Sequence, residues 1–135
     1  MKKLFIIMAV VLGLVSCQQT EDEKAAPLMQ RIDSLYRAGN YSATLHAITQ
    51  LRANHPKAVE SREKALKIWQ EASLKMAQAD IGRTDSALQA TIWQYNAAQT
   101  FGEKNRLRVK RDSLQVRYDA LCGTVRIIHH RQAEK

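Results

Sequence analysis

Hydrophobic positions recur along most of this chain with the period of a helix, and the clearest case is the last third. There, two interleaved positions repeat every seven residues, and a charged residue interrupts them once. These positions are Leu107, Leu114, Leu121 and Ile128, and Arg111, Tyr118, Val125 and Gln132. A repeat of this kind forms the seam that two helices bury against each other in a coiled coil. The pattern predicts one long helix.

The segment from residue 57 to 100 carries a second apolar stripe, but this stripe occupies two registers. A slip of one turn near Met76–Ile81 joins them, as a stutter does in a coiled coil. The other interpretation is a break at residues 80–82, with a new helix capped by Thr84 or Asp85. We favour one continuous helix, because a single internal glycine costs only about 1 kcal/mol. The first register contains Val59, Leu66, Trp69, Ser73 and Met76, and the second contains Ala77, Ile81, Thr84, Leu88, Thr91, Tyr95 and Ala98.

Folding the two segments back on each other predicts an antiparallel hairpin. With the turn at residues 101–102, five pairs coincide at one register, in which the two residue numbers sum to 202. The pairs are Tyr95 with Leu107, Leu88 with Leu114, Thr84 with Tyr118, Ile81 with Leu121, and Ala77 with Val125. The last segment then ends opposite Trp69. Val59, Leu66 and Trp69 therefore need other cover, which we expect from the helical pair at residues 27–54.

The chain before this hairpin predicts two short helices that pack as a pair. Apolar spacing places the first helix at about residues 27–38, with Pro27 in the first turn, where a missing N–H is tolerated. Gly39 suits the left-handed residue that follows a helix. The second helix begins near Ser42, its expected N-cap, and ends before Pro56.

The sequence LYRAGNYSATLHAITQLRANHP, residues 35–56, resembles a degenerate tetratricopeptide helical hairpin with its turn at residues 39–41. The large aromatic of that family's first helix is absent, and Thr44 stands where the family places a small alanine. A single repeat does not form the groove that arrays of such repeats use, so the resemblance implies packing only. The expected fold is all-α, with a short tetratricopeptide-like hairpin over 27–56 followed by a long antiparallel coiled-coil hairpin over 57–135.

The start of the chain has the layout of a secretory signal. Lys2 and Lys3 precede twelve uncharged residues, 4–15, which as a helix would reach about 18 Å, short of the ~30 Å hydrocarbon core of a membrane. Residues 14–17 (LVSC) resemble the bacterial lipobox, and this implies acylation of Cys17 and removal of residues 1–16 as a lipoprotein signal peptide. The other interpretation is an ordinary signal peptide that is cut elsewhere.

Residues 17–26 are interpreted as an acidic linker from the lipidated cysteine. Gln18 is not the aspartate that retains lipoproteins in the inner membrane of enteric bacteria, so we expect an anchor in the bacterial outer membrane, facing the periplasm or the cell surface. The run Thr20–Glu23 (TEDE) resembles the surface-export signal of lipoproteins from the Bacteroidetes. A solvated linker with chance charges is the other interpretation of this run.

Three stretches together resemble lipoproteins of Bacteroidales type from gut bacteria. They are the lipobox, KALKIWQEASLKMAQADIGRTDSALQ and RDSLQVRYDALCGTVRIIHHRQAEK, and with them the resemblance covers most of the chain after residue 16. It implies a compartment and a helical shape, and it implies no activity.

Charge is concentrated near the end of the chain. The whole sequence carries a net charge of +8, which falls to +6 without Lys2 and Lys3, and residues 101–135 hold 9 basic and 4 acidic side chains. An exported, lipid-tethered chain seldom meets nucleic acid, so we expect no nucleic acid partner. Lipid headgroups, acidic polysaccharide or an acidic protein face fit this charge better.

Little in the sequence points to metal binding or catalysis. Cys122 and His129 are separated by two helical turns, about 10 Å along the axis, which is too far for one ion with ligands at about 2.0 to 2.3 Å. Once Cys17 is acylated, Cys122 is the remaining thiol, so no intramolecular disulfide can form. The acidic residues are scattered and no glycine-rich phosphate loop is present. We expect no enzyme, no metal and no cofactor.

These features predict a helical scaffold or adaptor that is anchored to the membrane through its N-terminal lipid and contacts an envelope protein. The alternative is a periplasmic holdase or binding module for anionic or unfolded clients. We expect the partner surface on the outer side of the last helix, where two valines on the face away from the seam are unusual for a purely solvated helix. The valines could instead be scattered surface residues or pack on the first two helices. The candidate residues are Val109, Lys110, Val116, Arg117, His130 and Arg131.

Cys17 provides the direct test of the anchor. Metabolic labelling with an alkyne fatty acid should tag the wild-type protein and leave Cys17→Ser untagged, because the thiol is the acylation site of a lipobox cysteine. Equal labelling of both proteins would show that the motif is not used.

Overall fold

The computed structural model describes residues 19–134, and within this range the chain forms four α-helices and no strand. The predicted signal peptide and the lipid attachment site Cys17 lie outside the described residues. The all-α fold class is confirmed. The helices are α2 (Glu21–Arg37), α3 (Tyr41–Asn54), α4 (Val59–Ala97) and α5 (Phe101–Ala133).

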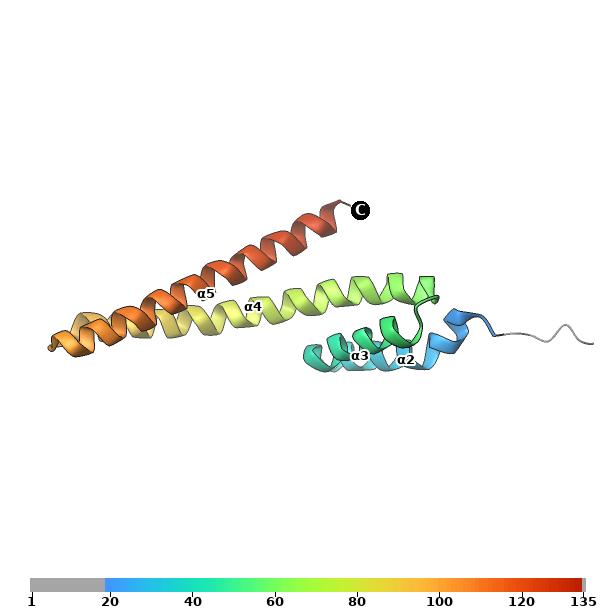
Figure 1. The fold of residues 1–135 in the computed structure, drawn as a ribbon, viewed down its shortest axis with the longest axis horizontal. Helices are drawn as coiled ribbons and strands as arrows, with labels where there is room; N and C mark the ends of the chain where they lie inside the picture. Colours follow the sequence, from blue (N-terminus) through green and yellow to red (C-terminus); the bar gives the residue numbers. More distant parts are fainter. Residues whose placement is uncertain (1–18, 135) are drawn as a thin grey trace, which may run out of the picture.

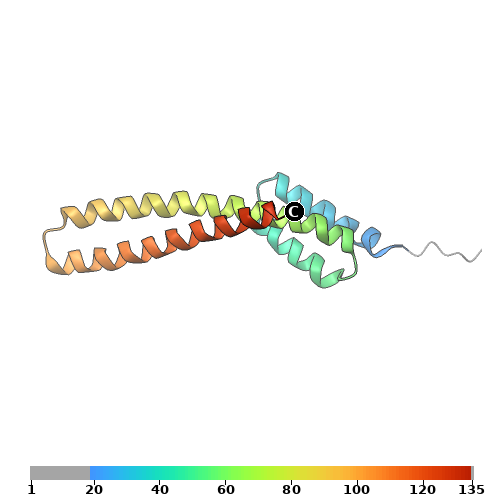
Figure 2. The ribbon, with the colours of Figure 1, turned by 90° about the horizontal axis from the view of Figure 1, so that it is seen from above.

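Helix α4 is the axis of an elongated molecule (Figure 1). Its 39 residues extend about 58 Å at 1.5 Å per residue. Helices α2 and α3 pack on its first half, and α5 folds back from the far end along a different side (Figures 1 and 2). Among the described helices, α5 contacts α4 alone, whereas α2, α3 and α4 all contact one another. The predicted order of a short hairpin followed by a long antiparallel one is therefore present.

The first helix begins six residues earlier than expected, so the predicted acidic linker is wrong for residues 21–26. Thr20 and Glu23 form a capping box, in which the Glu23 N–H donates to Thr20 Oγ1 at 3.1 Å and the Thr20 N–H donates to Glu23 Oε2 at 2.9 Å. Three acidic residues in the first turn also suit the positive end of the helix dipole. Pro27 consequently lies inside α2 and not at its start.

Asp22, in the same acidic run, caps a different helix. Its Oδ1 accepts a hydrogen bond from the Ser61 N–H at 2.7 Å, in the first turn of α4, whose own N-cap residue Ala58 supplies no side-chain cap. This hydrogen bond from the Ser61 backbone holds the pKa of the Asp22 carboxyl below its usual value. The acidic residues thus have a structural role that neither interpretation of the sequence included.

The turn between α2 and α3 follows from Gly39. This residue has a φ of 72°, and the Gly39 N–H donates to the Tyr36 carbonyl at 2.9 Å while the Asn40 N–H donates to the Leu35 carbonyl at 3.0 Å. Together these are the two bonds of a Schellman motif, as expected for glycine after a helix. Asn40 is the N-cap of α3, with its Oδ1 accepting from the Ala43 N–H at 3.2 Å, so the expected Ser42 cap is wrong.

The hydrophobic core lies where α2 and α3 meet the first half of α4. Ile32, Ile48 and Leu51 are fully buried there. The buried residues at the start of α4 are small, namely its N-cap Ala58 and then Ser61, Ala65 and Ala72, and Ile68 packs half-buried against the same core. The prediction that the helical pair at 27–54 covers Val59, Leu66 and Trp69 is wrong for Val59, which is 59% exposed, whereas Arg52 of α3 lies over the ring of Trp69. Small side chains let two neighbouring helices approach α4 closely, which the bulky stripe does not permit.

Helix α4 is continuous, as predicted, and the alternative of a break at residues 80–82 is wrong. The Ser86 hydroxyl donates to the Gly82 carbonyl at 3.0 Å within it. Thr100 caps α5 through the Glu103 N–H at 3.3 Å, so the turn occupies residues 98–100 and the expected turn at 101–102 is wrong. Both predicted stripes of the distal hairpin are buried or half-buried. They are Ala77, Ile81, Thr84, Leu88, Thr91 and Tyr95 in α4 with its C-cap Ala98, and all eight heptad positions of α5.

The core should dominate stability. Ile48→Ala removes a fully buried side chain and should lower the free energy of unfolding by about 2 to 5 kcal/mol. The matched change Ile127→Ala, at a residue 61% exposed, should cost below about 0.5 kcal/mol. Urea denaturation followed by circular dichroism measures both. Equal losses of the free energy of unfolding in the two variants would contradict the location of the core at Ile48.

Tyr36 ties α2 to α4 and should report this contact through pH. Its hydroxyl donates to Glu71 Oε2 at 2.7 Å, and this hydrogen bond raises the pKa of Tyr36 to about 12. Since the folded pKa lies above the ordinary value, the stabilisation is present below pH ~10 and is lost as the pH rises toward about 12. NMR titration of ring-labelled tyrosine should show this elevated pKa, and Glu71→Gln should return it toward its ordinary value. An unchanged titration in Glu71→Gln would contradict the assignment.

Candidate functional site

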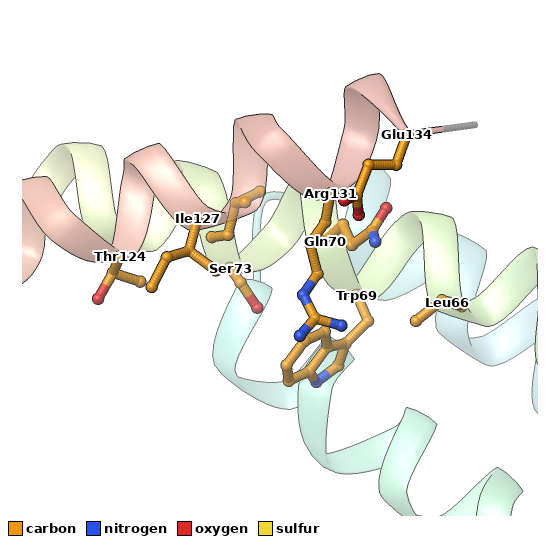
Figure 3. Close-up of a pocket in the computed structure, with 9 residues that line it drawn as sticks. Leu66, Trp69, Gln70, Ser73, Thr124, Ile127, Arg131 and Glu134 are labelled. Atoms are coloured by element: carbon orange, nitrogen blue, oxygen red, sulfur yellow. The ribbon is translucent and has the colours of Figure 1, made fainter.

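Helix α5 diverges from α4 toward its C-terminal end (Figure 1), and a hollow opens between the two helices there (Figure 3). It is a groove of about 660 Å³. Helix α4 supplies one wall and the last turns of α5 supply the other. The lining residues are Leu66, Trp69, Gln70 and Ser73 from α4, and Thr124, Ile127, Ile128, Arg131 and Glu134 from α5.

The groove follows from the change of register in α4. Distal to Ala77, the buried positions of α4 are seven residues apart and match the heptads of α5. If the seven-residue spacing is continued from Ala77 toward the start of α4, the next two positions are Gln70 and Glu63, which are polar. The apolar stripe has shifted by one turn to Leu66 and Trp69. Helix α5 therefore cannot keep its heptad register against α4 and also stay on the apolar side of α4. The seam therefore closes distally and stays open here.

The pairing register predicted for the hairpin, in which residue numbers sum to 202, also brings one pair of residues together at the open end of the seam. Gln70 and Gln132, whose numbers sum to 202, line one shallow hollow together with Lys67 and Glu71. A polar pair offers little burial energy to hold the helices together. The open seam is therefore consistent with the residues that meet there.

Trp69 is the centre of the groove. It is 37% exposed, and the Arg52 guanidinium of α3 lies 5.5 Å from its ring centroid, a cation–π distance. The side chain of Arg131 also extends from α5 toward the indole (Figure 3). Arginines of two different helices therefore approach Trp69, which lines the groove.

Two smaller hollows extend this surface. One, of about 320 Å³, shares Leu66 with the groove and adds Val59, Arg62 and Glu63 beside Arg52. The other, of about 640 Å³, shares Ile127, Arg131 and Glu134 and adds Arg126 and His130. Together they form an exposed apolar stripe with a rim of four arginines and two glutamates. His130 Nδ1 lies 3.3 Å from Glu134 Oε1, so one of those glutamates already has a neighbouring partner.

The six residues predicted from the sequence to form one partner surface lie on two different surfaces in the structure. Val109, Lys110, Val116 and Arg117 are exposed on α5 as expected. Because α5 contacts only α4 among the described helices, the interpretation that the valines pack on the first two helices is wrong. Arg131 lines the groove and His130 adjoins it, so these two belong to a different surface. Whether the valine surface binds a partner stays a prediction.

The described residues offer little for metal or catalytic chemistry. Within residues 19–134, no group of three His, Cys, Asp or Glu side chains is placed to hold a metal ion. Cys122 is half-buried beside Tyr118 and raises the pKa of that phenol. Over the same range, no helix combines the length and the apolar character required to cross a membrane.

Comparison of the chain with models of protein families, with curated proteins and with solved structures finds no match. The groove itself was not predicted from the sequence. The signal for it was present in the two registers of the α4 stripe, because a helix that changes its apolar face cannot keep one straight partner on that face throughout.

Proposed function

We propose that this protein is a lipid-anchored adaptor of the bacterial outer membrane that binds an amphipathic helix of an envelope protein in the groove between α4 and α5. The observation that carries the proposal is the exposed apolar stripe through Leu66, Trp69 and Ile127. Contiguous exposed apolar surface on a soluble domain commonly marks an interaction site. A helix laid in this groove would occupy the part of the seam that α5 leaves open.

The rim of the groove specifies the charge of the partner. Four arginines against two glutamates, one of them near His130, favour a helix with acidic residues beside its apolar face. Opposite charges accelerate association and fix the register, while burial of apolar side chains supplies the affinity. Tryptophan and arginine are also the residues that most often dominate binding energy at interfaces.

The proposed anchor would bring this groove close to the bilayer. Three residues separate Cys17 from the first residue of α2, Glu21, and the connection from Cys17 to Glu21 spans at most about 14 Å. The core of α2, α3 and α4 would therefore lie near the membrane, and the groove beside it. A partner that is itself held at the membrane would meet the groove at high effective concentration.

A holdase for anionic or unfolded clients is the second candidate. The exposed valines of α5, Val109 and Val116, and the positive charge of this helix favour it. The two candidates differ in stoichiometry. An adaptor should purify with one partner at a fixed ratio, whereas a holdase should suppress the aggregation of many unrelated clients.

Leu66→Glu with Ile127→Glu should test the groove. Each side chain contributes roughly 1.5 kcal/mol or more when fully covered, so the double variant should weaken partner binding by at least about a hundredfold. Both residues are partly or largely exposed in the free protein, so helicity should be unchanged. The readout is stoichiometric co-purification from native envelopes, with a photo-cross-linking residue at position 69 to show that the captured helix lies in the groove.

The matched control is Val109→Glu with Val116→Glu, which introduces the same charges on the outer face of α5. It should retain the partner. Loss of the partner in this control, with retention in the groove variant, would place the interface on the outer face and overturn the groove. Suppression of aggregation for many clients by the wild type, without a stoichiometric partner, would favour the holdase.

A further inference from the structure

Helix α4 turns into α5 at the end of the molecule opposite to α2 and α3 (Figure 2), and the sequence at this end is strongly basic. From Ser86 to Arg111 the sequence contains a single acidic residue, Glu103, and the net charge of this stretch is +4. The five basic residues all lie in the first three turns of α5. They are Lys104, Arg106, Arg108, Lys110 and Arg111.

These basic side chains are mostly not neutralised within the protein. Arg111 is paired with Asp112 at 2.7 Å, and Arg108 donates to the neutral amide oxygen of Asn105 at 2.9 Å. Among the described residues, Lys104, Arg106 and Lys110 form no ion pair. This end of the hairpin therefore offers several cations to an external anionic surface.

Two aromatic side chains are exposed at the same end. Trp93 is 73% exposed and Phe101 is 87% exposed, the two highest values among the large hydrophobic side chains of the described residues. Phe101 is the first residue of α5, and Trp93 lies four residues before the end of α4, about 6 Å along the axis. Neither aromatic contributes to the buried seam, so packing within the hairpin does not account for them.

We propose that this tip, defined as residues 93–111, binds the surface of an anionic phospholipid bilayer. Tryptophan and phenylalanine would enter the interfacial region, to which amphipathic aromatic rings are suited, and the basic side chains would face the phosphates. Phe101, Lys104 and Arg108 follow a spacing of three and four residues, so they share one face of α5. An end-on approach meets the turn of residues 98–100 first and reaches Trp93 about 6 Å past the end of α4, a distance comparable with the typical ~5 to 10 Å depth of interfacial elements.

The shape of the tip favours a lipid surface over a peptide or an acidic protein. The groove and the hollows described above are lined by residues 52–73 and 124–134, all at the other end of α4. A convex end with exposed rings and unpaired cations suits a broad, deformable anionic layer. The proposal needs neither the groove nor the lipid anchor, and it can be tested without them.

The test uses the chain from Gln18 to Lys135, which contains all four helices and their core. Trp69→Phe leaves Trp93 as the single tryptophan. Vesicles of phosphatidylcholine mixed with phosphatidylglycerol should shift Trp93 emission to shorter wavelength, and brominated acyl chains should quench it. Vesicles of phosphatidylcholine alone should bind far more weakly, and salt should reduce binding to the mixed vesicles.

Two pairs of substitutions separate the roles of charge and aromatic side chains. Lys104→Gln with Arg108→Gln should weaken binding to the mixed vesicles by about fivefold for each charge removed. Trp93→Ala with Phe101→Ala, followed by sedimentation of the vesicles, should weaken it by at least about tenfold. All four residues are exposed, and circular dichroism confirms that each variant stays helical.

The matched control is Arg117→Gln with Arg126→Gln, which removes the same charge from α5 away from the tip. It should change binding by less than about twofold, because these residues lie beyond the reach of screened electrostatics from a bilayer at the tip. An equal loss in this control would assign the attraction to the whole helix and overturn the proposal. Absence of a Trp93 shift, or binding to an acidic polysaccharide or peptide without binding to the mixed vesicles, would also overturn it.

Discussion

One helix in this protein has to satisfy two sets of neighbours on different faces. Over its first turns, α4 presents Ala58, Ala65 and Ala72 to α2 and α3, and over its second half it presents a heptad stripe to α5. Small residues allow two helices to pack closely at one end, and burial of Ile32 and Ile48 between them contributes roughly 1.5 to 3 kcal/mol for each side chain. The transition between these two faces decides where α5 can remain in contact, and therefore where apolar surface stays exposed.

The parts of the fold that could be predicted are those encoded by local periodicity. The heptads of α5 are buried or half-buried at every predicted position, and Gly39 adopts the left-handed conformation that its place after α2 requires. The start of α2 could also have been predicted, because Thr20 and Glu23 have the spacing of a capping box. The hydrogen bond from Ser61 to Asp22 could not be predicted, since it joins residues 39 positions apart and depends on how two helices pack.

For a related reason, the sequence pattern did not predict which face of α4 packs against α2 and α3. Val59, Leu66 and Trp69 give the stronger hydrophobic signal, but the fully packed positions of the other face are alanines and a serine that carry little of it, with Ile68 half-buried beside them. Where two helices cross closely, the buried residues have to be small as well as apolar. Hydrophobic periodicity indicates only which residues are apolar. The outer valines of α5 were correctly placed at the surface, whereas the groove appeared only once the neighbours of Trp69 were known.

The open groove gives α5 a gradient of stability along its length. Leu107 is its one buried residue within the described chain and lies near the turn, while Ile127 and Arg131 near its end line the hollow. Local segments with few buried contacts open most readily. A helix bound in the groove would bury Leu66, Trp69 and Ile127 together. A ligand that binds only the folded arrangement stabilises that arrangement, and above its dissociation constant the gain grows with the logarithm of the ligand concentration. Occupation of the groove would therefore order the last turns of α5 first, and the tip, which lies beyond the closed seam, would keep its geometry whether or not the groove is filled.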